Sequence, residues 1–316
     1  MSNIKDDSSI LSIPFCPLCD KPFQLFLSNI KDPQTQDSFS IVHCDSCHLQ
    51  KTMPEPIDIK RYYSDYYQGN RHGFTARICA NRRVKWINPF HVKSGKLLDI
   101  GCGDGAFLLA AKSYDWKTFG TEMNPMKAKK KGVLVFDDIR QAENHAPFDC
   151  ITLWHTLEHM SDPLALLHRL RLLLSAGGVL WIAVPNAGGW QSQLFGKHWI
   201  HRDVPRHLYH FNPKSLQKLL NKAGFKMIQS AHQEFEYDVL GWSQSMLNCV
   251  SKTPNQFFHL LTGKKKNARF FEKIILYLVG VVISAFSLPL LFFSAMAKSG
   301  GTLIVAAKRN DIDYLQ

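Results

Sequence analysis

Four of the eight cysteines form two Cys-x-x-Cys pairs, Cys16 with Cys19 and Cys44 with Cys47. Two such pairs around a short predicted hairpin have the ligand spacing of a tetrahedral thiolate zinc site. The N-terminus lacks the pattern of a secretory signal, so we expect a cytoplasmic, reducing environment, where paired cysteines favour metal over disulfides. We predict a structural Zn²⁺ in a zinc-ribbon-like module at residues 1–53, which the metal helps to fold. Four unrelated structural cysteines are the alternative.

A second group of residues follows the apolar stretch that begins at Lys96. Asp99 stands just before a glycine-rich turn, and glycines there permit positive φ and let the backbone approach a ligand closely. Glu122 ends the next predicted strand, where a carboxylate can accept both hydroxyls of a ribose, as in dinucleotide-binding folds. The turn contains Gly101, Cys102, Gly103 and Gly105.

Titratable side chains form a third group. A nucleophilic oxygen or carbon must lose a proton when it reacts, and His or Glu takes that proton best at neutral pH. His155 is the first candidate because it follows the fourth predicted strand directly, and Arg206 is a possible anchor for a substrate phosphate or carboxylate. A purely structural role is the alternative for each histidine. The candidate general bases are His155, Glu158, His159, His207 and His210.

The elements that must position these groups alternate between strands and helices. Asp162-Pro163 is typical of a helix start, and Gly224 of a helix end. We expect helices at residues 76–87 and 213–223, and strands beginning at Lys96 and covering residues 116–122, 133–136, 148–153, 177–186, 225–230 and 301–307.

The run from Asp99 to Gly105 resembles the first motif of class I S-adenosylmethionine-dependent methyltransferases (type 11/12/23-like), and the likeness covers residues 96–230 and 301–307. The resemblance implies an α/β fold with a Rossmann-like, seven-stranded methyltransferase sheet and helices on both faces. To this the chain would add the small N-terminal four-cysteine zinc module and a hydrophobic helical insertion before the last strand.

The same resemblance implies S-adenosyl-L-methionine as the cofactor. The glycine turn would hold its methionine part, with Asp99 acting through the loop backbone and bound waters near the amino group. Glu122 would bind the ribose, Asp138 the adenine amino group, and Ile139 the face of the adenine ring. The implied cofactor-binding set is Asp99, Gly101, Cys102, Gly103, Gly105, Glu122, Met123, Asp138, Ile139 and Trp154.

The formal charge of +12 favours an anionic partner: nucleic acid, a membrane surface or a phosphorylated substrate. Nucleic acid is the less favoured of these, because the basic runs lack interleaved aromatics and Leu153-Trp154-His155-Thr156 stands where base methyltransferases carry an Asn/Asp-Pro-Pro-Tyr motif. The tyrosine-rich segment at residues 62–67 either covers the acceptor pocket or packs against the next domain.

An apolar run at residues 274–297 follows Lys264-Lys265-Lys266 and is long enough to cross a membrane. The final strand must return to the sheet, however, so we expect a helical hairpin that breaks at Pro289 and either dips into one leaflet or forms the acceptor entrance. Membrane contact is expected through residues 264–297, and a full span or a buried hairpin are the alternatives. The domain plan is zinc-ribbon-like module 1–53, connector 54–94, methyltransferase domain 95–240, helical insertion 241–299 and final strand 300–310.

These features predict methyl transfer to a small-molecule, sugar or lipid-linked acceptor, by in-line attack on an activated sulfonium methyl at the inner face of a membrane. The subfamily that the downstream segment resembles often works near polysaccharide, lipid or quinone biosynthesis. The zinc-like head with the tyrosine run is also similar to sugar C-methyltransferases. An RNA or nucleic-acid methyltransferase, or a non-catalytic protein that binds the cofactor, are the other interpretations.

Overall fold

The computed structural model describes residues 14–63, 75–90, 93–264 and 269–310, and the larger of its two sheets has seven strands. These strands are β4 (Lys96–Ile100), β5 (Lys117–Thr121), β6 (Val135–Phe136), β7 (Phe148–Trp154), β8 (Leu174–Pro185), β10 (Phe225–Ala231) and β11 (Thr302–Arg309). Their order is β10-β11-β8-β7-β4-β5-β6. The strands from β4 to β8 pair in parallel, whereas β11 runs antiparallel to both β8 and β10. The predicted Rossmann-like sheet is confirmed, and its last strand begins at Thr302, one residue after the expected start at 301.

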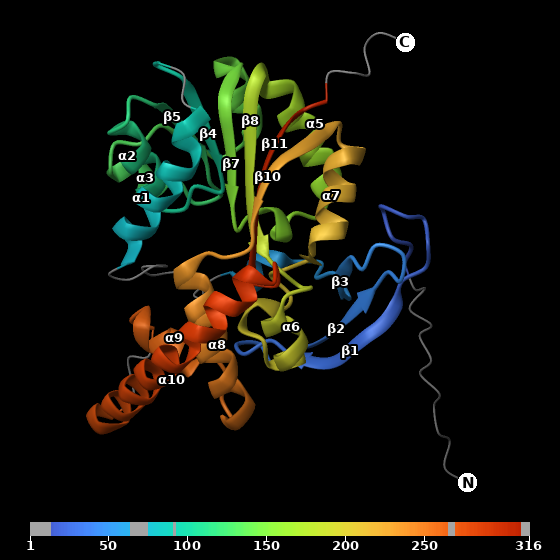
Figure 1. Cartoon of the computed structure of the whole chain (residues 1–316), viewed down its shortest axis with the longest axis vertical. Helices are drawn as coiled ribbons and strands as arrows, with labels where there is room; N and C mark the ends of the chain where they lie inside the picture. Colours follow the sequence, from blue (N-terminus) through green and yellow to red (C-terminus); the bar gives the residue numbers. More distant parts are fainter. Residues whose placement is uncertain (1–13, 64–74, 91–92, 265–268, 311–316) are drawn as a thin grey trace.

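Helices cover both faces of this sheet (Figure 1). One face carries α1 (Ala76–Ile87), α2 (Ala106–Lys112) and α3 (Met126–Lys130); the other carries α4 (Ile139–Ala142), α5 (Pro163–Leu173) and α7 (Pro213–Lys222). Side chains alternate along a buried strand, so each strand feeds two apolar layers. Leu97 belongs to the layer shared with α1 and α2, and Leu98 to the layer shared with α5 and α7.

The local signals for helix ends act as predicted. The side chain of Asp162 accepts a hydrogen bond from the backbone of Ala165 at 2.9 Å, with Pro163 as the first residue of α5. Asn212 caps α7 in the same way, and Gly224, with φ of +76°, follows the end of that helix. These signals set where the strands after each helix begin.

The smaller sheet joins the N-terminal segment to the domain of the large sheet. It is antiparallel in the order β1-β2-β3-β9, with β1 (Gln24–Lys31), β2 (Ser38–His43), β3 (Gln50–Met53) and β9 (Tyr209–His210). Strands β1 and β2 form the hairpin that was expected between the cysteine pairs. The fourth strand comes from the domain of the large sheet, and Leu18 and Phe23 share one apolar cluster with α7. The N-terminal module is therefore built into the main core.

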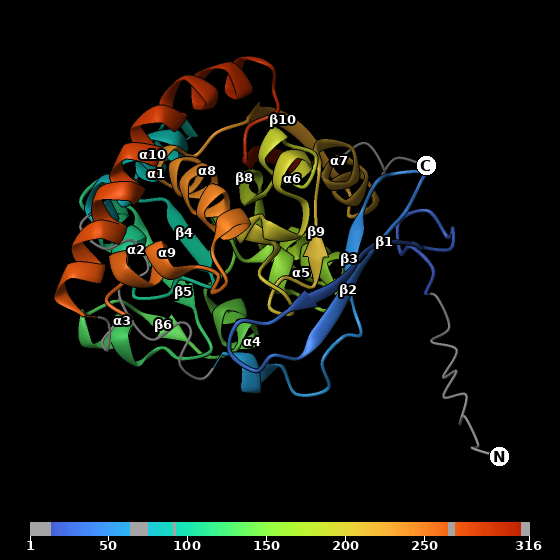
Figure 2. The same cartoon turned by 90° about the horizontal axis from the view of Figure 1, so that it is seen from below.

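Three helices extend from the carboxyl edge of the large sheet: α8 (Phe235–Val250), α9 (Gln256–Leu261) and α10 (Phe270–Met296) (Figures 1 and 2). They pack against one another, and α8 also contacts α6 (Trp190–Phe195). The start of α8 and the residues after α10 meet at Asp238, whose carboxylate accepts hydrogen bonds from Gly301 and Thr302. The two long helices, α8 and α10, therefore run in opposite directions. We call residues 235–299 the helical arm.

The expected break at Pro289 is wrong, because α10 continues through that residue. A proline removes one backbone hydrogen-bond donor from a helix. Ser287 and Leu291 lie on either side of Pro289 and are buried, and their packing stabilises the continuous helix. The expected hairpin within residues 274–297 is therefore wrong as well: these residues belong to the single helix α10, which packs against α8. Among the helices that the structure describes, α10 alone is long and apolar enough to cross a membrane by length and composition, and only 17% of its most apolar window is buried.

Candidate active site

The glycine turn between β4 and α2 has the conformation that the sequence predicts. Gly101, Gly103 and Gly105 have φ values of +72°, +58° and +77°. A side chain at Gly101 would be strained, because its Cβ would lie 2.6 Å from the hydroxyl oxygen of Thr156. A Cβ at Gly103 would meet no atom of the described residues within 4 Å, so the outer side of the turn is open to a ligand.

Two acids lie at this turn. Glu122, just after β5, accepts hydrogen bonds from the backbone N–H of Gly103 at 2.9 Å and of Asn124 at 3.2 Å. Asp99 is buried and accepts a hydrogen bond from the Thr152 hydroxyl at 2.6 Å. Burial raises the pKa of Asp99 to about 7, although the Thr152 hydrogen bond acts in the opposite direction.

The other residues of the predicted cofactor set occupy different surroundings. Asp138 caps α4 and pairs with Arg140, whose hydrogen bonds lower the pKa of that carboxyl to about 2. Ile139 is partly buried beside it, and Met123 is 70% exposed. Burial raises the pKa of the Cys102 thiol well above its ordinary value. Trp154 ends β7, with the guanidinium of Arg83 4.9 Å from its ring centre.

A cavity of about 360 Å³ lies beyond the carboxyl edge of the sheet. Its polar end contains four of the five predicted bases: His155, Glu158, His159 and His207. Its apolar end is formed by the helical arm, through Val239 and Leu240 of α8, Phe257 and Leu261 of α9, and Tyr277 and Val281 of α10.

The titratable groups at the polar end converge on one point. Ligand atoms of Glu158, His159 and His207 lie within 4.8 Å of one another, and His155 Nδ1 lies 3.8 Å from Glu158 Oε1. Nδ1 of His159 lies 2.9 Å from the Arg206 carbonyl oxygen and 3.0 Å from the Tyr63 hydroxyl. Tyr63 of the tyrosine run thus contacts a residue that lines the cavity, and residues 64–67 lie outside the described residues.

Burial keeps two imidazoles at the cavity neutral. It lowers the pKa of His207 to about 4 and that of His201 to about 3. Nδ1 of His207 lies 2.8 Å from the carbonyl oxygen of His201, and because a carbonyl only accepts, that nitrogen carries the proton. The basic atom of His207 is therefore Nε2, which lies 3.9 Å from Glu158 Oε1.

Two predicted site residues lie elsewhere. His210 is in β9, where Nε2 lies 3.0 Å from the Thr52 hydroxyl, and it is not among the described residues that line the cavity. The proposed anchoring role of Arg206 is wrong. Its guanidinium is fully buried and pairs with Asp32 at 2.8 Å and Asp203 at 2.7 Å, so it joins the N-terminal sheet to the catalytic region.

Sequence reasoning missed Glu234 and Arg83, which pair with each other beside His155. It also missed Tyr237, whose ring stacks on His155 with centres 3.8 Å apart. Glu234 follows the end of β10 by a short loop, and β10 runs parallel to β8 because both are antiparallel to β11. The signal that singled out Glu122, an acid just after a parallel strand, could therefore have found Glu234.

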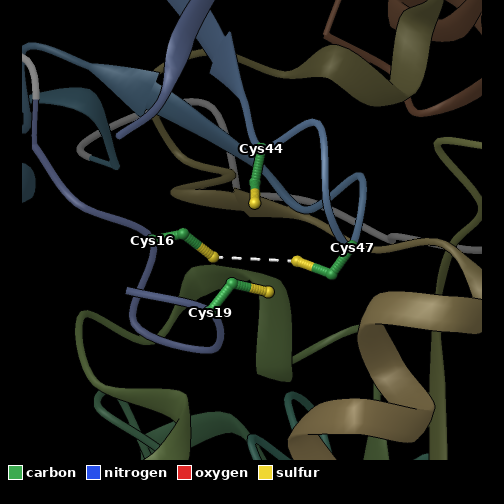
Figure 3. Close-up of side chains that lie close together, drawn as sticks. All are labelled: Cys16, Cys19, Cys44 and Cys47. Atoms are coloured by element: carbon green, nitrogen blue, oxygen red, sulfur yellow. Dashed lines mark hydrogen bonds between the residues drawn. The ribbon is translucent and has the colours of Figure 1, made fainter. Parts of the chain in front are cut away.

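The four predicted zinc ligands come together at the N-terminal module (Figure 3). The thiols of Cys16, Cys19, Cys44 and Cys47 lie within 4.8 Å of one another, and Cys16 and Cys47 have their sulfurs 3.7 Å apart. Zinc–sulfur bonds of ~2.3 Å in a tetrahedron place sulfurs roughly 3.8 Å apart, so this donor set fits Zn²⁺. The ammonium group of Lys218 on α7 lies 3.0 Å from Cys19 Sγ, where it would offset the charge of a metal-bound thiolate.

Several known proteins are similar to the large domain. The ubiquinone biosynthesis O-methyltransferase of Cereibacter sphaeroides (strain ATCC 17025 / ATH 2.4.3) is 26% identical over 188 residues, covering 54% of this chain and 76% of that protein. That of Histophilus somni (strain 2336) is 25% identical over 187 residues, covering 54% and 71%. A SAM-dependent methyltransferase structure from Archaeoglobus fulgidus superposes with a TM-score of 0.46 at 17% identity, covering 80% of this chain and 100% of that one.

The family itself follows from a match over residues 67–230, just over half of the chain, to the family described as methyltransferase domain. The matched segment contains the glycine turn, Glu122 and the residues after β7 that line the cavity. The chain belongs to this family, and it is an S-adenosylmethionine-dependent methyltransferase.

Proposed function

We propose that this enzyme methylates a lipid-linked or otherwise amphipathic small molecule at the inner face of a membrane. One observation carries the proposal: a single cavity joins the cluster of His155, Glu158, His159 and His207 to the apolar helical arm. An acceptor with a polar reactive end and an apolar tail matches both ends of such a cavity.

The residues around the glycine turn fit S-adenosylmethionine, which supplies an activated methyl group when bound. The backbone of Gly101 and Gly103 would hold its methionine part, with Asp99 acting through the loop and ordered water. Glu122, already fixed by Gly103, would accept the ribose hydroxyls. Asp138 and Ile139 would lie at the adenine, and Cys102, Gly105, Met123 and Trp154 would complete the pocket.

The histidines and the glutamate supply the acid–base chemistry. A hydroxyl acceptor must lose its proton as its oxygen bonds to carbon, and a neutral imidazole can accept that proton. Burial lowers the pKa of His201 and His207, which keeps both rings neutral near pH 7. His155 is the primary candidate, with Glu158, His159 and His207 close enough to relay the proton. His210 is not among the described residues that line the cavity, so we give it a structural role.

The helical arm supports contact with a bilayer. Large apolar side chains of α10 are exposed along its length, including Phe270, Ile275 and Phe286. Lys264 and Arg269 lie just before the helix and suit anionic lipid, at about 1 kcal/mol per basic residue near a charged surface. Because β11 returns to the sheet, we propose peripheral or monotopic binding at the cytoplasmic side. Lys265 and Lys266 lie outside the described residues.

The relatives named as ubiquinone biosynthesis O-methyltransferases support an oxygen acceptor and a lipid-linked substrate. The cysteine cluster is proposed as a structural zinc site, because protein sulfurs fill all four positions of the tetrahedron.

The test uses the full-length protein with S-adenosylmethionine that carries a radiolabelled methyl group. Purified protein is incubated with lipid, RNA and water-soluble small-molecule fractions of a cell extract, and label is measured in each. We expect label in the lipid fraction, stable to alkali as an ether would be. Label in RNA would identify a nucleic-acid methyltransferase, and label confined to the water-soluble fraction would favour a sugar; either result would overturn the proposal.

A further inference from the structure

Glu234 is a fully buried carboxylate with three side-chain partners: His155 after β7, and Arg83 and Cys79 on α1, the Cys79 thiol lying 3.4 Å from its Oε1. Its Oε2 lies 2.7 Å from Nε2 of His155, and its Oε1 accepts a hydrogen bond from Nε of Arg83 at 2.8 Å. Among the described residues that line the cavity, His155 is included and Glu234 is not. The carboxylate therefore stands behind the histidine, on the side away from the cavity.

The charge of this carboxylate decides which nitrogen of His155 holds the proton. Burial alone would raise the pKa of Glu234, but the charge of Arg83 and the hydrogen bond from His155 hold that pKa well below its usual range. An ionised carboxylate only accepts hydrogen bonds, so Nε2 of His155 must carry a hydrogen. In the neutral ring Nδ1 is then the basic nitrogen, on the side of Glu158.

The ring of His155 is also fixed in direction. The residue has a φ of +52°, an uncommon backbone conformation for a side chain of this size. Tyr237 stacks flat against the imidazole at an interplanar angle of 7°. A hydrogen bond at one end, a stacked ring on one face and a constrained backbone together define one orientation of the base.

We propose that Glu234 is the positioning residue of the methyl-transfer site: it holds His155 with Nε2 protonated and Nδ1 toward Glu158, and it stabilises the imidazolium formed during transfer. The inference rests on the proposed function, because it assigns a partner to that base. The arrangement has the logic of a carboxylate that orients a catalytic histidine in a hydrolase triad.

The proton and electrons balance in the step that this arrangement serves. The acceptor oxygen forms a bond to the methyl carbon, and the carbon–sulfur bond breaks with its electron pair going to sulfur. The hydroxyl proton passes to Nδ1 of His155. The imidazolium then lies between the ionised Glu234 and the carboxyl group of Glu158, and solvent takes the proton afterwards. The charged or titratable groups that face His155 are Glu234, Arg83, Tyr237, Glu158, His201 and His207.

The first experiment measures kcat, KM and their pH dependence with the lipid fraction that the wild-type enzyme labels. Glu234→Gln is expected to lower kcat about 10²-fold or more with little change in KM. The imidazolium loses its counter-charge, so the acidic limb of the kcat profile should move to lower pH by about 1–3 units. Glu234→Asp should recover part of kcat. The matched control is Glu143→Gln, which breaks another glutamate–arginine pair, with Arg169, away from the cavity.

The second experiment needs no acceptor and tests positioning directly. Nitrogen-15 NMR of histidine-labelled protein assigns the tautomer of His155, with His155→Ala used to identify its signals. We expect the Nε2-protonated form in the wild type and a mixture of forms in Glu234→Gln. Thermal unfolding and affinity for S-adenosylhomocysteine establish that each variant is folded.

The outcomes separate this inference from the proposed function. A wild-type enzyme that labels no lipid would refute the acceptor class, while the NMR result would still decide whether Glu234 sets the tautomer. An unchanged tautomer and an unshifted pH profile in folded Glu234→Gln would overturn the positioning role. If Glu234→Gln does not fold, Glu234→Asp carries the test. A partly reduced kcat with the Nε2-protonated tautomer retained supports the role of the charge, whereas full activity in His155→Ala would overturn it.

Discussion

Glu122 accepts a hydrogen bond from the backbone N–H of Gly103 at 2.9 Å, although the two residues are 19 positions apart. This bond ties the end of β5 to the turn after β4. The carboxylate is therefore placed at the turn before any ligand arrives, and its second oxygen accepts from Asn124. The turn and the acid can be tested separately, each by its own substitution.

Replacing Gly101 by Arg is expected to abolish binding of S-adenosylhomocysteine. The site has φ of +72° and Thr156 occupies the space for a Cβ, so the turn must move. Isothermal titration calorimetry measures the affinity, and Gly177→Ala, at a glycine with open space around it, is the control. Wild-type affinity in the Gly101 variant would contradict the assignment of the turn.

Replacing Glu122 by Gln should weaken S-adenosylhomocysteine binding by roughly 10- to 100-fold. The amide keeps the size of the side chain but loses the charge-assisted acceptance of ribose hydroxyls, a loss of about 1.5–3 kcal/mol. Calorimetry again gives the affinity, and Glu143→Gln controls for the removal of one acid. A change below about twofold would rule out ribose binding by this carboxylate.

Asp99 should make the cofactor-free protein less stable as pH rises. Burial raises its pKa to about 7 from an ordinary value of 3.8, so the folded state favours the protonated acid. The cost of holding the ionised form grows as pH increases between these values and is complete above about pH 7. The melting temperature of Asp99→Asn relative to wild type is therefore expected to rise from about pH 5 to about pH 8. A difference that stays constant with pH would argue against the raised pKa.

Purified protein is expected to contain one zinc ion per chain, measured by elemental analysis. Cys16→Ser should lose the metal and lower the melting temperature by about 5 °C or more, because metal binding contributes to folding. Cys249→Ser provides the control, since that thiol is exposed on α8. If wild-type protein without zinc had the same melting temperature as protein supplied with zinc, the four cysteines would be structural thiols only.

Glutamate at Val282 and Phe286 of α10 should reduce binding to vesicles of phosphatidylglycerol and phosphatidylethanolamine about tenfold or more. These side chains are 52% and 78% exposed, so the change places charge where lipid contact is expected. Leu172→Glu, at a residue 73% exposed on α5, is the control. Co-sedimentation with the vesicles measures binding. If the variant at Val282 and Phe286 sediments with the vesicles as much as the wild type does, α10 is not part of the membrane contact.

The elements with strong local signals could be predicted from the sequence. Helix α1 begins and ends at the expected residues, and the turn after β4 has the expected positive φ values. Such features depend on residues that are close in the chain, where glycine, proline and capping side chains act directly. The same holds for the cysteine pairs, because each Cys-x-x-Cys turn is local.

The features that could not be predicted depend on distant contacts. Glu234 lies 79 positions from His155 and 151 from Arg83 in the sequence. Its partners therefore depend on the pairing of β10 within the sheet and on the packing of α1 against that sheet. The continuous course of α10 through Pro289 depends on its packing against α8 and α9. Arg206 looked like a substrate anchor because its partner, Asp32, belongs to a module whose docking no local pattern reveals.

The merging of the cysteine module with the main core has a physiological consequence. Leu18 and Phe23 pack in the same apolar cluster as Leu216 and Leu219 of α7, and β9 completes the N-terminal sheet. Whatever free energy zinc adds by binding is therefore shared with the domain that transfers methyl groups. If the cluster binds zinc as proposed, cells starved of zinc are expected to hold less of this protein in its folded form.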